Sequence, residues 1–169
     1  DVSKQGNYII LTNSKAITSS DSINHVELYK QYRNSIAGGA YNTQIYMIQQ
    51  LDDQFAYGIT HHPLAIRNFI NFALDHFSEK PEQLFIIGRG RDYKNLRNNT
   101  NDYIQTYGFP PSDMLLTARS AIQNTPQIGV GRLDVTDGIQ IRDYLEKVKE
   151  YEADLNDTIP SAQTPLNKL

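Results

Sequence analysis

Four short apolar runs, separated by stretches with helical spacing, set the pattern of this chain. The runs lie at residues 7–13, 42–50, 83–88 and 126–135. They are rich in β-branched and aromatic residues and are bounded by polar or glycine turn residues, which predicts four buried strands. The segments between them place apolar residues three and four positions apart, so the sequence predicts intervening helices.

The boundaries of these helices have recognisable signals. One helix begins near Val26, after several polar residues that can cap it. A second follows Pro63, which suits a first helical turn because its missing N–H has no helical partner there. Its apolar stripe comprises Ile66, Phe69, Ile70, Ala73 and Phe77. A third begins at Asp137, which has the spacing of a capping box with Gln140.

Strands that alternate with helices pair in parallel, and the helices cover both faces of the sheet. The sequence therefore predicts an α/β fold, a three-layer sandwich with a parallel sheet of about four strands. We expect residues 1–156 to form this unit and residues 157–169 to be a linker or the start of a next subdomain. Both ends of the sequence look cut, so we expect a piece of a larger protein.

Composition excludes several classes of function. The 169 residues are 39% hydrophobic and 21% charged, which is typical of one soluble folded domain. The net charge is −3 and the basic residues are scattered, so nucleic acid is not an expected partner. No apolar run approaches the roughly 18 residues that a membrane span needs. Cysteine is absent, which excludes a cysteine nucleophile and thiolate metal ligands from this chain.

The glycines of residues 86–93, IIGRGRDY, raise the question of a phosphate-binding loop. A dinucleotide fingerprint needs three glycines, and Tyr93 stands where the third would be. No apolar-periodic helix follows whose N-terminus could meet a phosphate, and no Gly-Lys-Ser/Thr sequence is present. We therefore reject a nucleotide site and interpret Gly88 and Gly90 as residues that let the backbone turn at a strand end.

Other catalytic and metal-binding patterns are weak. His61 and His62 are adjacent and cannot readily share one ion, so a capping or surface role is favoured. No Gly-x-Ser-x-Gly elbow is present. Asp92, Asp102 and Asp113 have oxygens that calcium prefers, but their spacing matches no known loop motif. We predict no cofactor, with calcium as a weaker alternative to ordinary solvated carboxylates.

Five stretches, taken in order, resemble one enzyme family. They are LDDQFAYGITHHPLAIRNFINFAL, LFIIGRGRDY, PPSDMLLT, IGVGRLDV and YLEKVKEYE. Together they are similar to the gingipain-type cysteine peptidases, and within that family to the PorU-like sortases of type IX secretion in Bacteroidota. The resemblance covers residues 8–152. No single stretch is specific, and the signal lies in the order of all five.

The resemblance implies a function for the protein from which this chain comes. Gingipain-type catalytic domains are caspase-like and contain two α/β subdomains, and this chain resembles the first. The catalytic Cys and His of the family belong to the second subdomain, so this chain alone is not expected to be active. It would supply scaffold and part of the substrate cleft of a peptidase that processes secreted proteins. Its implied partners are the second subdomain and a protein or peptide substrate, and its implied location is the cell surface, outer membrane or periplasm.

A different class of function stays open, namely a non-catalytic interaction module of the secretion apparatus that keeps the peptidase fold. The discriminating feature is whether the parent sequence contains both a His and a Cys at strand ends after Leu169. In either case the site has the same candidate residues for the cleft or the subdomain interface, which are Asp113, Arg132, Ser112, Arg89 and Asp92. The resemblance places the family's Ser-Asp on Ser112-Asp113 and its Gly-Arg on residues 131–132, whereas Arg89 replaces an acidic residue. A buried ion pair or strand-end anchor is the favoured role for Asp113 and Arg132.

Overall fold

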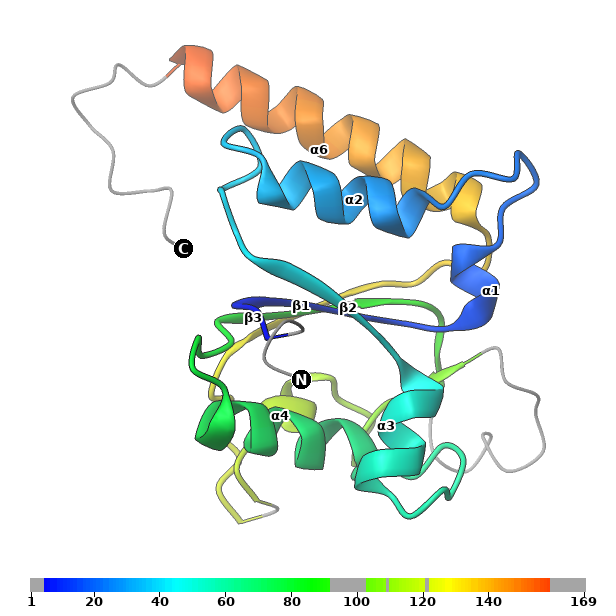
Figure 1. Cartoon of the computed structure of the whole chain (residues 1–169), viewed down its shortest axis with the longest axis vertical. Coiled ribbons are helices and arrows are strands. Elements are labelled where there is room, and N and C mark those ends of the chain that lie inside the picture. The colour runs from blue at the N-terminus through cyan, green and yellow to red at the C-terminus, as the bar shows by residue number, and fades with distance from the viewer. Residues whose placement is uncertain (1–4, 92–102, 109, 121, 159–169) are drawn as a thin grey trace.

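The computed structural model describes residues 5–91, 103–108, 110–120 and 122–158 as three layers, with a sheet between two groups of helices (Figure 1). The main sheet has the order β2-β1-β3-β6, and all its pairings are parallel. Its strands are β1 (Tyr8–Thr12), β2 (Thr43–Met47), β3 (Gln83–Ile87) and β6 (Gly129–Leu133). The predicted α/β sandwich with four parallel strands is confirmed.

Helices cover both faces of the sheet (Figure 1). On one face lie α1 (Ser14–Ile17), α2 (His25–Asn34) and the long α6 (Gly138–Thr158). On the other lie α3 (Ile48–Phe55), α4 (Ala65–His76) and the 3₁₀ turn η2 (Met114–Thr117). None of the helices in the described part of the chain is long and apolar enough to cross a bilayer.

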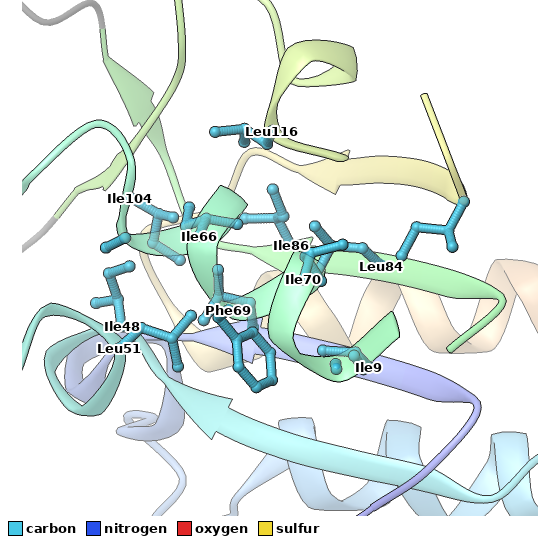
Figure 2. Packing of buried hydrophobic residues seen from close by; sticks show 14 of the residues in the cluster. Ile9, Ile48, Leu51, Ile66, Phe69, Ile70, Leu84, Ile86, Ile104 and Leu116 are labelled. Carbon is cyan, nitrogen blue, oxygen red and sulfur yellow. The ribbon is translucent and has the colours of Figure 1, made fainter. Parts of the chain in front are cut away.

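Each face of the sheet has its own hydrophobic core, because side chains alternate between the faces along a strand. On the α3/α4 side, Ile9, Leu84 and Ile86 pack with Ile66 and Phe69 (Figure 2). The core on the α2/α6 side comprises Tyr8, Ile10, Ala16, Val26, Tyr29, Phe85, Ile87, Val135, Ile141 and Leu145. Burying one such Ile, Leu or Phe side chain contributes about 1.5–3 kcal/mol, so these two clusters are the main source of stability.

The strand order places a topological switch point between β1 and β3. The chain passes from β1 outward to β2, returns across β1 to β3, and then continues outward to β6 on the opposite side. The connections after β1 and β3 therefore leave in opposite directions. In open parallel sheets such a switch point, at the carboxyl ends of the strands, is where ligands bind.

The structure differs from the sequence prediction in two segments. The second strand ends at Met47, and α3 begins at Ile48, where the sequence favoured a strand to residue 50. Ile48 and Leu51 are buried three residues apart, which is the spacing of a short helix face. The polar stretch after β3 contains a second, two-stranded parallel sheet of β4 (Gly90–Arg91) and β5 (Ile104–Gln105).

The start of α6 agrees with its predicted cap. The Asp137 carboxylate accepts a hydrogen bond from the N–H of Ile139 at 2.9 Å. In return, Gln140 Oε1 accepts from the N–H of Asp137 at 3.2 Å. These bonds satisfy backbone N–H groups that lack a partner within the helix. The helix continues to Thr158, and the domain boundary expected at residue 156 stays a prediction.

Candidate functional site at the carboxyl edge of the sheet

Arg132 and Asp113, the two leading candidates, form a bidentate ion pair. Arg132 Nε lies 2.7 Å from Asp113 Oδ2, and its Nη2 lies 2.8 Å from Oδ1. The two side chains are 10% and 24% exposed. A planar guanidinium opposite a carboxylate fixes geometry as well as charge, so this pair sets the position of the segment that precedes η2.

The same guanidinium also binds three backbone carbonyls. Its Nη1 donates to the carbonyls of Gly88 at 3.0 Å and Ile104 at 3.3 Å, and its Nη2 donates to that of Gln105 at 3.4 Å. These carbonyls belong to the end of β3 and to β5. Arg132, which lies near the end of β6, therefore joins three segments beyond the carboxyl ends of the strands. We call Arg132, Asp113 and these three carbonyls the Arg132 clamp.

The two glycines of the IIGRGRDY stretch are explained by this clamp. Gly88 has φ +151°, and a Cβ there would lie 2.9 Å from Ile104 Cδ1. A Cβ at Gly90 would lie 3.2 Å from Arg132 Nε. Gly88 thus lets the backbone turn at the strand end, as the sequence interpretation proposed, and the two glycines also let Ile104 and Arg132 approach closely, which the sequence did not indicate.

The other candidate residues lie beside the clamp or outside the described part of the chain. Arg89 is 49% exposed, and its Nε lies 3.5 Å from Asp134 Oδ1, so it forms a separate surface pair. Ser112 forms an isolated antiparallel bridge with Tyr107, with N–H···O distances of 2.8 and 3.3 Å, which orients the adjacent Asp113. Asp92 lies outside the described residues.

A buried polar cluster that the sequence did not indicate lies next to the clamp. Asp52, only 4% exposed, accepts from the N–H of His61 at 2.9 Å and from Gln105 Nε2 at 3.3 Å. Gln105 Nε2 also donates to the carbonyl of His62 at 3.0 Å. Burial raises the pKa of Asp52, and the hydrogen bonds from His61 and Gln105 oppose that rise. The cluster ties the turn after α3 to β5.

A second arginine holds η2 against α4. Arg67 Nε and Nη2 donate to the carbonyl of Leu115 at 3.1 and 2.7 Å, and the guanidinium lies 3.8 Å from the centre of the Tyr107 ring. Arg67 is buried. The one feature of the sequence that could have indicated this role is a charged residue beside the apolar stripe, in the stretch AIRNF. Asp52 and Gln105 offered no such feature, because the chain separates them by 53 residues and only the topology brings them together.

Metal binding has no support in the described residues, where no group of three His, Asp or Glu side chains is placed to hold an ion. Asp92 and Asp102, two of the three carboxylates considered for calcium, lie outside them. His62 Nδ1 accepts from the N–H of Leu64 at 3.2 Å, just before α4 begins. His62 therefore stabilises the turn before α4, whose N-cap residue is Leu64 and has no side-chain cap hydrogen bond.

At this edge Arg132 pairs with Asp113, and Arg89 pairs with Asp134. The sequence model of peptidase family C25 matches residues 1–165, so this chain belongs to that family, which contains the gingipains. The resemblance to gingipain-type cysteine peptidases is thereby confirmed. No curated protein sequence matches the chain.

One solved structure with a similar fold is the crystal structure of dimeric latent PorU from Porphyromonas gingivalis. The TM-score is 0.61 and the sequence identity is 15%, so the likeness shows the fold alone. The match covers 89% of this chain but 16% of the PorU chain. This chain therefore corresponds to a small part of that protein.

Proposed function

We propose that this chain is the first, non-catalytic subdomain of a gingipain-type cysteine peptidase that processes secreted proteins. The observation that supports this most directly is a C25 family match over residues 1–165 in a chain without cysteine. A cysteine peptidase needs a thiolate nucleophile. In this proposal the nucleophile and its His partner lie in a second subdomain of a longer parent protein.

The role that we infer for this subdomain rests on how Arg132 is paired. The Arg132 guanidinium is fully engaged by Asp113 and three carbonyls, so it cannot also bind a substrate carboxylate without breaking the clamp. The clamp instead holds the segments at the carboxyl edge in one arrangement. The chain thus supplies one wall of the substrate cleft. Ser112 and the more exposed Arg89 lie beside that wall, and Asp92 follows it in the chain.

Chemistry in the parent would follow the usual course for a thiol peptidase. The thiolate attacks the peptide carbonyl carbon, backbone N–H groups stabilise the oxyanion, and the His transfers the proton to the leaving amine. A rigid wall contributes by orienting the peptide rather than by reacting with it. The substrates would be exported proteins, and the location would be the cell surface, outer membrane or periplasm.

The test uses the intact parent protein and a cysteine-reactive peptidyl probe, with the labelled residue located by mass spectrometry. We expect one labelled cysteine outside residues 1–169, protected by an added peptide substrate. The matched control is the parent with that cysteine changed to serine, which should give no label. The isolated chain should hydrolyse no peptide, and reproducible hydrolysis by it would disprove the assignment.

The second candidate is a non-catalytic interaction module with the same fold. The observation that favours it is the internal pairing of Arg132 with Asp113, because two charged groups that pair with each other need no reaction to explain them. Absence of labelling in a folded parent, with the probe active on a control peptidase, would select this function over the first.

A further inference from the structure

The two outer strands of the main sheet, β2 and β6, differ in how their outward backbone groups are hydrogen-bonded. At the β2 edge, β1 pairs with Asn42, as the bond from the Tyr8 N–H to the Asn42 carbonyl at 3.3 Å shows. Because the pairing of a parallel strand alternates by residue, Thr43, Ile45 and Met47 direct their N–H groups outward. The Thr43 N–H is satisfied by Asn34 Oδ1 at 2.9 Å and the Met47 N–H by Gln50 Oε1 at 3.3 Å. Side chains thus bond two of the three outward N–H groups of β2.

The outward backbone groups of β6 have no such partners among the described residues. The Gly129 N–H donates to the Glu82 carbonyl at 3.1 Å, and the Leu133 carbonyl accepts from the Gly88 N–H at 3.0 Å. By the same alternation, Val130 and Arg132 direct both their N–H and C=O groups away from β3. Across the described ranges, no hydrogen bond joins these four backbone groups to another segment. They form an open row of donors and acceptors.

The nearest segment contacts the residues just before β6 and not the outward groups of Val130 and Arg132. The Gln127 N–H donates to the Thr117 carbonyl at 3.1 Å, and Thr117 Oγ1 donates to the Ile128 carbonyl at 3.4 Å. The end of η2 therefore bonds to the residues that lead into β6. Exposed edges are normally guarded by proline, a bulge or a charged side chain. The one charged side chain of β6 is Arg132, and it is turned into the clamp and 10% exposed.

The α2/α6 side of β6 is bare at Gly131. Gly131 lies opposite Phe85 in the register, and both Gly131 and Gly129 are exposed. A Cβ at Gly131 would lie 3.6 Å from Phe85 Cδ2, which is ordinary contact. The surface at Gly131 therefore has room for a side chain of an added strand to approach β6.

We propose that the free edge of β6 is the docking surface for the second subdomain of the parent protein, through a strand that pairs with Val130 and Arg132. This rests on the proposed function, and it is supported by the match to 16% of a much longer related chain. The row ends at Arg132, so a partner docked there lies beside the Arg132 clamp. The β6 edge would thus bring the second subdomain to the carboxyl edge, where the cleft is expected.

Amide hydrogen exchange tests the docking surface directly. In the isolated chain the amides of Val130 and Arg132 should exchange rapidly, whereas in the intact parent they should exchange more slowly by a factor of about 100 or more. The fragment covering β6 reports both amides by mass spectrometry. Equal exchange in the two proteins would overturn the proposal. Protection in the isolated chain that grows with its concentration would also overturn it, because the occupant would then be a second copy.

Two lysine substitutions provide a matched pair of variants. Gly131→Lys puts a charge on the bare side of β6, and Gln44→Lys puts one on β2, at the opposite edge. Both isolated chains should unfold at nearly the wild-type temperature. In the parent, Gly131→Lys should remove the protection of Val130 and Arg132, and Gln44→Lys should leave it; equal effects of the two would contradict the docking surface.

The outcome is separable from that of the proposed function. A labelled cysteine with an unprotected β6 edge would keep the peptidase and reject this docking surface. A protected edge without a labelled cysteine would keep the docking surface in a non-catalytic parent.

Discussion

Two partly buried arginines, Arg132 and Arg33, hold opposite ends of the molecule. Arg132, at the carboxyl edge, binds Asp113 and three carbonyls, one that follows β3 and two in β5. Arg33, at the amino edge, binds Glu152 at 2.8 Å and Tyr29 Oη at 2.9 Å, and so connects α2 to α6. One fixes loops near the candidate cleft, and the other fixes helices far from it.

The surroundings of the two cations explain this division. Arg33 lies 5.9, 5.2 and 5.7 Å from the ring centres of Tyr8, Tyr29 and Tyr32. Aromatic rings add cation–π attraction and apolar contact, which suits an anchor between helices. Burial, together with the hydrogen bond to Glu152, raises the pKa of Tyr32 to about 12. The partners of Arg132 are instead polar groups that it binds in fixed directions. The stabilisation by Arg132 therefore depends on hydrogen-bond geometry, and a side chain of another shape would lose most of it.

The largest expected effect is that of Arg132→Ala. It leaves the Asp113 carboxylate and three carbonyls without their donor, and breaking a buried pair on one side costs about 3–5 kcal/mol. Because Asp113 is 24% exposed, we expect the low end of that range in urea unfolding. Arg132→Lys is the control, since it keeps the charge but not the bidentate fork and should lose less. Equal losses for the two variants would show that geometry is unimportant here.

Gly88→Ala should have the next largest effect. A side chain at φ +151° is strained, and its Cβ would lie 2.9 Å from Ile104 Cδ1. Such backbone strain costs of order 1–3 kcal/mol. Gly131→Ala, where the new Cβ finds ordinary contact at 3.6 Å, is the matched control and should change the free energy of unfolding by less than about 0.5 kcal/mol. A harmless Gly88→Ala would contradict the explanation given for the IIGRGRDY stretch.

Glu152→Gln tests the other arginine and should cost about 1 kcal/mol. The amide keeps the shape and can still accept from Arg33 or Tyr32, but it removes a partly screened charge from the pair. Glu150→Gln on the exposed side of the same helix is the control, with no measurable loss expected. Chemical unfolding of the wild type and the two variants at pH 7 measures both changes in unfolding free energy. A Glu152→Gln loss as large as that of Arg132→Ala would remove the distinction between the two arginines.

The sequence predicted the layers more fully than the clamp. Hydrophobic periodicity located all four strands of the main sheet, because a buried strand or helix face must repeat in the sequence. Asp113 and Arg132 were named through family resemblance, with an ion pair as the favoured role. Arg33 and Asp52 were missed because a polar contact between distant segments leaves no periodic trace. The helix at Ile48 was missed because β-branched and aromatic residues continue up to it.

The smallest expected effect is a pH dependence from Asp52, at the turn that joins α3 to β5. Burial raises the pKa of this carboxyl above its usual value near 3.9. The folded chain therefore keeps the proton at a pH where the unfolded chain has lost it. The stabilisation by this proton is complete below about pH 3.9 and is lost as the pH rises through the folded-state pKa. Asp52→Asn should remove this slope, so the difference in unfolding free energy between the two proteins should change with pH above about 4 and be constant below it. A difference that is constant across that range would mean that the hydrogen bonds from His61 and Gln105 fully offset the burial of Asp52.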